Sequence, residues 1–245
     1  MYEMIDFHCH PDLYNNNFKI LRYAEENNFK IIAMTNLPGL YKRYNDRLRN
    51  ESAIKISLGY HPQLIEDYPN EIRVFLNYVK EAKFIGEVGL DLSSSKNKNI
   101  EKQKEIFSQI ISECNKLGNK IISIHSRKAD HIIFNHLKKG TCIYILHWYT
   151  GDIQRLLYAM SNDDNIYVSI NLNMTSTNNG RKLIKLVPLS KILLETDAPF
   201  TKETNIEYPK TILNTIATEI AKIKGCNLQK VINEIKYNSY RILHI

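Results

Sequence analysis

The chain has 245 residues, of which 43% are hydrophobic, and its 33 basic and 26 acidic side chains give a formal net charge of +7. This length and apolar content suit one domain with a large buried core, and they exclude a disordered or fibrous chain. No apolar run approaches the roughly 20 residues that span a bilayer, and the start at Met1-Tyr2-Glu3 shows no cleavable leader, so we expect a cytoplasmic protein with no membrane association.

Eight short apolar runs rich in β-branched residues predict strands. They lie at residues 4–8, 30–35, 54–59, 84–88, 120–125, 142–147, 166–170 and 191–195. Helical periodicity lies between them, at 17–28, 69–81, 99–117, 151–160 and 180–187, and again at 208–223 and 227–243 around Gly225. This alternation predicts an α/β fold: a single (β/α)8 TIM-type barrel over residues 1–245, with additional C-terminal helices.

Side chains that bind metals recur at the ends of these predicted strands. In a (β/α)8 barrel, the carboxyl ends of the strands converge on one active-site face. The pattern therefore predicts a dinuclear metal hydrolase with two divalent ions. The candidate ligands are His8, His10, Glu87, His125, His147 and Asp197.

His8 and His10 are two residues apart at the end of the first strand, so both imidazoles face the same side and can hold one ion. Cys9 lies between them and points the opposite way, which argues against its being a ligand. The chain has four cysteines and no Cys-x-x-Cys pair, so we interpret all of them as reduced and mostly structural.

Glu87 lies between Gly86 and Gly89, which permit close backbone approach around its carboxylate. A carboxylate buried after an apolar strand is costly unless it is paired, and a metal site removes that cost. With His125 and His147, Glu87 would supply three ligands to a second ion. The alternative is a buried salt bridge from Glu87 to Lys83 or Arg127.

Asp197 ends the eighth strand, where it can bind the first ion and accept a proton from the nucleophilic water. Glu195 shares its strand face, and we interpret it as a structural ion-pair partner deeper in the barrel. His61 follows the third strand and is better placed to contact a substrate oxygen than to complete the metal shell. Asp197, Glu87 and His61 are therefore the candidate catalytic residues.

Cationic and aromatic residues near the strand ends offer substrate contacts. Arg127 and Lys128 follow His125 and can bind phosphate oxygens, although a solvated face explains them equally well. Trp148 or Tyr149 can stack on a base, but packing beneath the loop is the simpler role. Basic residues after the second strand can contact phosphates or form an exposed helix face, namely Lys42, Arg43, Arg47 and Arg49.

Six segments, taken jointly, resemble the TatD-like branch of the metal-dependent amidohydrolase superfamily. They are DFHCHPDLY at 6–14, GYHPQL at 59–64, GEVGLD at 86–91, ISIHSRKA at 122–129, LHWYTGD at 146–152 and LLETDAPF at 193–200. The resemblance covers nearly the whole chain. It implies a (β/α)8 barrel, a mono- or dinuclear site and a metal-dependent deoxyribonuclease activity of exonucleolytic type.

The same resemblance implies roles for individual residues. His8, His10, Glu87 and Asp197 resemble the ligands of the first ion, and Glu87, His125 and His147 those of the second. His61 resembles the additional active-site histidine of the family.

Within this branch, the HCHPDLY, GYHPQL, ISIHSRKA and ILHWYTGD segments are most similar to the TatD-like nuclease of Qat anti-phage defence systems. That similarity implies defence-operon partners, among them an ATPase and a QueC-like enzyme.

The leading hypothesis is a DNase that cleaves phosphodiester bonds with a water activated by two ions of Zn, Mn or Mg, acting on single-stranded or frayed DNA ends. A second hypothesis keeps the site but changes the bond, to an ester or amide in an aminoacyl-tRNA, a modified peptide or a nucleoside. A third is a non-catalytic module that binds nucleic-acid ends or a defence complex. The sequence leaves the metal, the substrate and the oligomeric state open.

Overall fold

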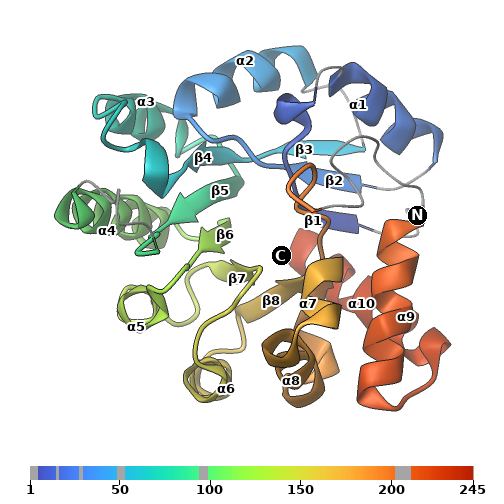
Figure 1. Ribbon diagram of the computed structural model, residues 1–245. Helices are drawn as coiled ribbons and strands as arrows, with labels where there is room; N and C mark the ends of the chain where they lie inside the picture. Colours follow the sequence, from blue (N-terminus) through green and yellow to red (C-terminus); the bar gives the residue numbers. More distant parts are fainter. Residues whose placement is uncertain are drawn as a thin grey trace. The chain divides into compact units, whose positions relative to one another are not determined.

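The computed structural model (Figure 1) describes residues 5–14, 17–27, 30–48, 53–93, 99–201 and 211–244. Its contacts divide the chain into two compact units. Unit 1 comprises Met1–Ala33, Asn50–Lys55 and Val168–Ile245, and unit 2 comprises Met34–Arg49 and Ile56–Tyr167. That residues 1–245 form one domain stays a prediction.

Unit 2 is built on four parallel strands in the order β4-β5-β6-β7. They are β4 (Leu58–Tyr60), β5 (Phe84–Gly89), β6 (Ile121–His125) and β7 (Ile143–His147). Nearly every side chain in them is buried, as expected for a parallel sheet covered by helices. The strands are parallel, and a polar residue lies at or near the carboxyl end of each: His61, Glu87, His125 and His147. These side chains therefore lie toward one edge of the sheet.

The described part of this unit also contains five helices and a short 3-10 turn. They are α2 (Pro38–Leu48), η2 (Pro62–Leu64), α3 (Glu71–Tyr78), α4 (Ile100–Leu117), α5 (Asp130–Ile133) and α6 (Ile153–Asn162). Of these, α2 precedes β4, α6 follows β7 and the others connect the strands. Helix α3 packs on β4 and α4 on β5, on one face of the sheet (Figure 1). Asn99 caps α4 by accepting a hydrogen bond from the Lys102 amide, and Asp152 caps α6 by accepting one from the Arg155 amide.

Unit 1 contains two parallel strand groups. Strands β1 (Ile5–Cys9), β2 (Lys30–Ala33) and β3 (Ile54–Ile56) form one, and β8 (Ile166–Ile170) pairs with β9 (Ile192–Leu194) from Val168 onward. The connecting elements are η1 (Pro11–Leu13), α1 (Asn17–Glu26), α7 (Leu172–Ser176), α8 (Asn178–Leu186) and η3 (Leu189–Lys191). Strand β1 contacts β9, so the first and last strands of the chain are neighbours in this unit.

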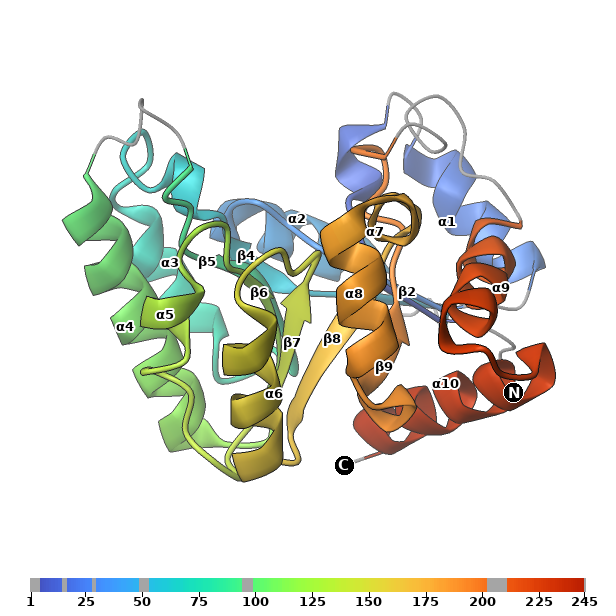
Figure 2. The same cartoon turned by 60° about the horizontal axis from the view of Figure 1, so that its bottom comes forward.

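Two further helices follow β9, α9 (Ile212–Lys224) and α10 (Leu228–Leu243), and both pack on β9 (Figure 2). Gly225 ends α9 with a φ of 63°, the left-handed conformation that glycine adopts without a steric penalty. Asn238 of α10 donates from its side-chain amide to the carbonyls of Leu189 and Ile192, each at 2.9 Å. The amphipathic stretches around Gly225 are thus the additional C-terminal helices that the sequence predicts.

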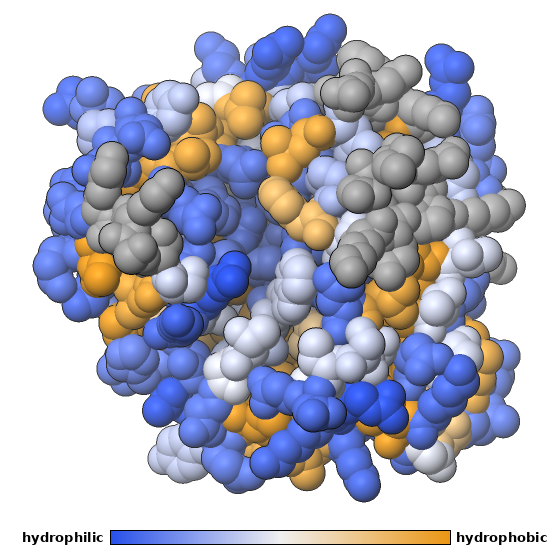
Figure 3. All heavy atoms as spheres, in the orientation of Figure 1, coloured by the Kyte–Doolittle hydropathy of each residue, from blue (hydrophilic) through white to orange (hydrophobic). Residues whose placement is uncertain are grey.

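The strands lie where the sequence predicts them, to within a few residues at each end. The exception is the run at 54–59, which is divided into β3 and β4 at Ser57. Helices α2, α5 and α7 lie outside the predicted helical stretches. For α5 and α7 the reason is that four or five residues are too few to show a helical period. In the described part of the chain, no helix is long and apolar enough to cross a bilayer. Hydrophilic residues cover most of the face seen in Figure 3.

Candidate metal centre

The first cluster of ligands consists of His8, His10 and Asp197, all in unit 1. The Asp197 amide donates to the His8 carbonyl at 2.8 Å, and the His10 amide donates to the Ala198 carbonyl at 2.8 Å. These two bonds join the segment after β9 to the end of β1. The backbone therefore places the three side chains together, although almost the whole sequence separates them.

The donor atoms of the first cluster converge in a buried space. His8 Nε2 lies 3.1 Å from His10 Nε2, and the two nitrogens lie 3.7 and 3.6 Å from Asp197 Oδ1. None of the three residues is more than 4% exposed. Their ligand atoms fall within 4.8 Å of one another, close enough to hold one ion. Two imidazoles and a carboxylate are a donor set that suits Zn or Mn.

Asp6 supports this cluster, and sequence reasoning missed it. Its carboxylate accepts hydrogen bonds from the His8 amide at 3.2 Å, the Thr196 amide at 3.0 Å and the Thr196 hydroxyl at 2.6 Å. The signal in the sequence is an aspartate two residues before His8. Cys9 is fully buried, and its burial raises the pKa of the thiol well above the usual value, which disfavours the thiolate that a metal would bind.

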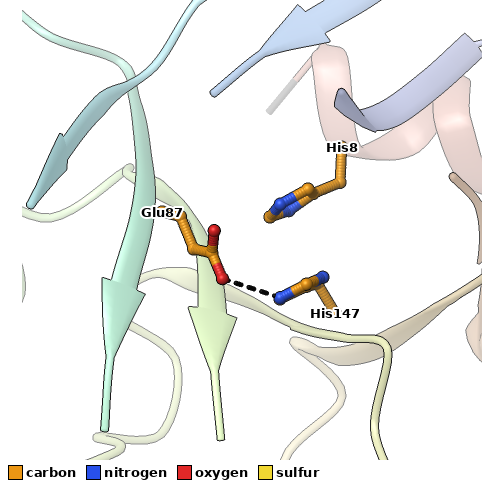
Figure 4. Close-up of side chains that lie close together, drawn as sticks. All are labelled: His8, Glu87 and His147. Carbon is orange, nitrogen blue, oxygen red and sulfur yellow. Dashed lines mark hydrogen bonds and ion pairs between the residues drawn. The ribbon is translucent and has the colours of Figure 1, made fainter. Parts of the chain in front are cut away.

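The second cluster lies in unit 2 and is centred on the Glu87 carboxylate. Glu87 Oε1 lies 2.6 Å from His125 Nδ1 and 2.8 Å from His147 Nε2. Figure 4 shows the carboxylate and the His147 ring facing each other. One oxygen is thus shared by two imidazoles from β6 and β7. The partners of Glu87 seen here are histidines, whereas the alternative from the sequence was a salt bridge to Lys83 or Arg127.

His61 lies beside the second cluster, with Nε2 3.7 Å from Glu87 Oε1 and its ring 5.0 Å from that of His125. Its Nδ1 accepts a hydrogen bond from the Gln63 amide at 3.2 Å, so in the neutral ring Nε2 carries the proton. His61, Glu87 and His125 also form a group close enough to hold an ion. The sequence favours a substrate contact for His61, and this geometry is compatible with either role.

Asp91 is a second residue that sequence reasoning missed, although it lies in the GEVGLD segment. Its Oδ2 lies 3.1 Å from His125 Nε2. Burial opposes the charged form of each group, but the hydrogen bonds of His125 to Asp91 and Glu87 raise the pKa of His125, and those of Asp91 to His125 and Ser93 lower the pKa of Asp91.

Gly89 sets the separation of β5 and β6. A Cβ atom at this position would lie 1.9 Å from the carbonyl oxygen of His125, so any other residue would push the two strands apart. The predicted close backbone approach around Glu87 is confirmed at this glycine. The loops after β6, β7 and β9 contain Lys128, Trp148 and Asp197 with positive φ, a conformation that is often concentrated at functional sites.

Other candidate residues lie outside both clusters. Glu195 is fully buried and accepts hydrogen bonds from Ser169 and Asn171, which are neutral groups. Its burial agrees with a structural role, and the predicted ion pair stays a prediction. Tyr149 is buried, with its hydroxyl bonded to Asp130 at 3.0 Å, so it packs beneath the loop as the simpler reading predicted. Trp148 is half-buried.

The candidate phosphate contacts are solvent-accessible. Arg127 and Lys128 are exposed on the loop that follows His125. Lys42, Arg43 and Arg47 are exposed on α2, which agrees with an exposed helix face. Arg49 lies outside the described residues.

Comparisons with known proteins agree with this geometry. The model of the family described as "TatD related DNase" matches residues 5–244. An uncharacterized metal-dependent hydrolase of Methanocaldococcus jannaschii is 28% identical over 96% of this chain and 94% of its own length. Human deoxyribonuclease TATDN3 is 25% identical over 98% of this chain and 94% of its own.

Solved structures show the fold. The TatD homologue YJJV of Escherichia coli superimposes with a TM-score of 0.83 and 19% identity, over 98% of this chain and 97% of that one. A TatD-family hydrolase of Entamoeba histolytica gives a TM-score of 0.79 and 16% identity, over 98% of both chains. The α/β, TIM-type barrel predicted from the sequence is thereby confirmed.

Proposed function

The chain belongs to the TatD related DNase family and is a metal-dependent hydrolase, and from this premise we propose that it is a deoxyribonuclease that cleaves phosphodiester bonds. The observation that carries this proposal is that imidazole nitrogens and carboxylate oxygens face one another within each cluster. All of these residues are buried except His125, which is partly exposed. Buried groups of this kind are costly unless a cation or a network of hydrogen bonds compensates them.

The ligands are assigned to two ions. His8, His10 and Asp197 hold the first, and His125 and His147 hold the second, with Glu87 contributing to both. Each of these residues lies within three residues of the carboxyl end of a strand. In a TIM-type barrel, these strand ends carry the active-site residues. The nitrogen-rich donor set favours Zn or Mn over Mg.

The bound ions would supply Lewis acidity and lower the pKa of a water molecule. Asp197 accepts the proton of that water, since its carboxylate is buried, lies three residues after β9 and offers a second oxygen beside the ligand atom. His61 donates from Nε2 to a non-bridging phosphate oxygen, because its Nδ1 is occupied by the Gln63 amide. Glu87 keeps the rings of His125 and His147 in place through its shared oxygen.

The substrate of this proposal is DNA with single-stranded or frayed ends, degraded exonucleolytically. Phe200 supports it, because the ring is 59% exposed and yet contacts the ring of His10 edge-on at 5.3 Å. An exposed aromatic ring beside a metal ligand is a surface on which an unpaired base can stack. Arg127 and Lys128 are exposed after His125 and are assigned to the phosphates on either side of the cleaved bond.

The chemical class of the bond is tested by turnover of matched phosphodiester, ester and amide substrates by the purified, metal-loaded protein. The proposal expects selective turnover of phosphodiesters. Selective turnover of an ester or amide would replace it with the deacylase or peptide-processing hypothesis. Function that survives in a His8→Ala/His10→Ala double variant would replace it with a non-catalytic binding module.

We place this enzyme in the cytoplasm, in an anti-phage defence system of the Qat type with an ATPase and a QueC-like enzyme as partners. The support is the similarity of the HCHPDLY, GYHPQL, ISIHSRKA and ILHWYTGD segments, together with four free cysteines that suit a reducing compartment. Co-purification of the tagged protein with the ATPase and the QueC-like enzyme tests the partners. Loss of phage protection in the Asp197→Asn variant tests the defence role.

A further inference from the structure

Asp91 is held by donors from several elements of unit 2. Its Oδ2 accepts from the Gln63 side-chain amide at 2.8 Å and lies 3.1 Å from His125 Nε2. Its Oδ1 accepts from the amide and the hydroxyl of Ser93, at 2.9 and 2.6 Å. Its own amide donates to Gln103 Oε1 of α4 at 3.0 Å. The residue is fully buried, so this network fixes both the position and the rotation of the carboxylate.

From this network we infer that Asp91 is a positioning residue that sets the tautomer and the orientation of His125; the inference rests on the proposed metal centre. An ionised carboxylate only accepts hydrogen bonds, so the ring nitrogen that faces Asp91 must carry a proton. That nitrogen is Nε2. Nδ1 lies 2.6 Å from Glu87 Oε1, and without an ion a proton is needed between these two atoms as well. An ion held at this place would displace that proton and leave the ring with the one on Nε2, which Asp91 keeps in place.

Gln63 connects this device to His61. Its side chain donates to Asp91, while its backbone amide donates to His61 Nδ1 at 3.2 Å. One residue of η2 therefore takes part in orienting two histidines of the second cluster. With the ion bound, His125 would keep its proton on Nε2 and present Nδ1 to the ion, and His61 is set with its proton on Nε2 near the same carboxylate.

A purely structural role would make Asp91 a tether for the segment after β5, through its Oδ1 and Ser93. The two edges of the carboxylate separate these roles. Oδ1 faces the backbone of its own loop, whereas Oδ2 faces His125 and Gln63. Removing the charge of Asp91 while keeping one side-chain oxygen changes the contact with His125 most. The remaining oxygen can still accept the hydrogen bond from the Ser93 amide.

The variant Asp91→Asn exploits that difference at constant side-chain volume. The amide oxygen stays on the Ser93 amide, and the amide nitrogen is turned toward His125 Nε2, which then has to accept. The ring proton moves to Nδ1, where it blocks coordination. We expect the affinity for the second ion to fall about 10- to 100-fold. We expect kcat to fall, and KM for DNA to change less than kcat.

The direct readout is the ¹⁵N chemical shifts of the His125 ring in protein saturated with Zn. Wild type should show Nε2–H and no proton on Nδ1, and Asp91→Asn should show Nδ1–H. Ser93→Ala is the matched control, since it removes one bond to Oδ1 and leaves the His125 contact; its tautomer should match wild type and its affinity for Zn or Mn should stay within about twofold of wild type.

An Nδ1–H tautomer in wild type would overturn the inference even if Asp91→Asn does not fold. Unchanged tautomer and metal affinity in a folded Asp91→Asn protein would also overturn it, and would leave Asp91 as a tether. These tautomer readings need no DNA. Failure of the proposed nuclease function, seen as intact DNA with metal-loaded wild type, is therefore distinguishable from failure of the role assigned to Asp91.

Discussion

Replacing Asp130 with alanine should destabilise the loops behind the second cluster. Asp130 is the first residue of α5, and a single carboxylate oxygen accepts from the Tyr149 hydroxyl at 3.0 Å, the Asp152 amide at 3.1 Å and Arg155 Nη1 at 2.6 Å. The carboxylate thus joins the segment after His125 to the segment after His147. Removing it breaks that connection and leaves both histidines with less support.

The expected cost follows from two of these bonds. A hydrogen bond to a charged acceptor contributes about 1.5 to 3 kcal/mol, and water can partly replace Asp130 at the Asp152 amide because that loop is accessible. The Tyr149 hydroxyl keeps a second partner, the Asp152 carbonyl at 2.8 Å. We therefore expect about 2 to 4 kcal/mol in total, with no contribution assigned to the exposed Arg155. For a chain of this size, that lowers Tm by roughly 5 to 15 °C.

The assay is urea or thermal unfolding of wild type, Asp130→Ala and Asp130→Asn across pH. Burial opposes the charge of Asp130, but hydrogen bonds from the Asp152 amide, Arg155 and Tyr149 outweigh it and lower the pKa. A lowered folded-state pKa gives stability that is present above the unfolded value of about 3.9 and is lost as pH falls through the folded value. The cost of Asp130→Ala should therefore be complete at pH 6 and shrink below about pH 4.

Asp130→Asn keeps an acceptor oxygen without the charge and should lose about half as much, because neutral hydrogen bonds are roughly half as strong. A cost of Asp130→Ala below about 0.5 kcal/mol, or one that does not change between pH 6 and pH 3, would refute this reasoning.

The remaining predictions concern the chemistry. Asp197→Asn should lower kcat about 10²- to 10⁴-fold while the fold and metal content measured by elemental analysis are retained; an unimpaired variant would remove Asp197 from proton transfer. Chelation should abolish activity, and Zn or Mn should restore it better than Mg; activity that persists after complete metal removal would contradict the ligand assignment. Phe200→Ala should weaken binding of single-stranded DNA about 5- to 150-fold, from about 1 to 3 kcal/mol of stacking, and leave duplex binding almost unchanged; equal losses on both would argue against a stacking surface. Reversing the charges of Lys42, Arg43 and Arg47 should reduce the salt dependence of DNA affinity, and an unchanged slope would leave them as a solvated helix face.

Local patterns in the chain predict most of the fold because strand and helix periods are short-range properties. The eight apolar runs identify the strands, and Gly225 identifies the break between α9 and α10. No such period marks the break at Ser57 between β3 and β4, or the single-turn helices α5 and α7. They depend on packing that the sequence does not display.

Candidate site residues are predictable when they lie at or near a strand end, as for His8, Glu87 and His147. Asp6 and Asp91 are not, because their roles consist of hydrogen bonds to groups that are distant in sequence, such as Thr196 and His125. A supporting carboxylate has the same local signature as any polar residue beside a strand. The two units likewise follow from contacts along the folded chain, not from any linker visible in the sequence.

The measurement that tests the central claim most directly is digestion of end-labelled single- and double-stranded DNA by metal-free protein reconstituted with Mg, Mn or Zn, beside Asp197→Asn and a chelated control. We predict metal-dependent laddering from the ends, fastest on single strands and absent from the Asp197→Asn protein. Intact DNA under every condition, from protein that binds two ions for each chain, would contradict the nuclease assignment and transfer the same site to an ester or amide substrate.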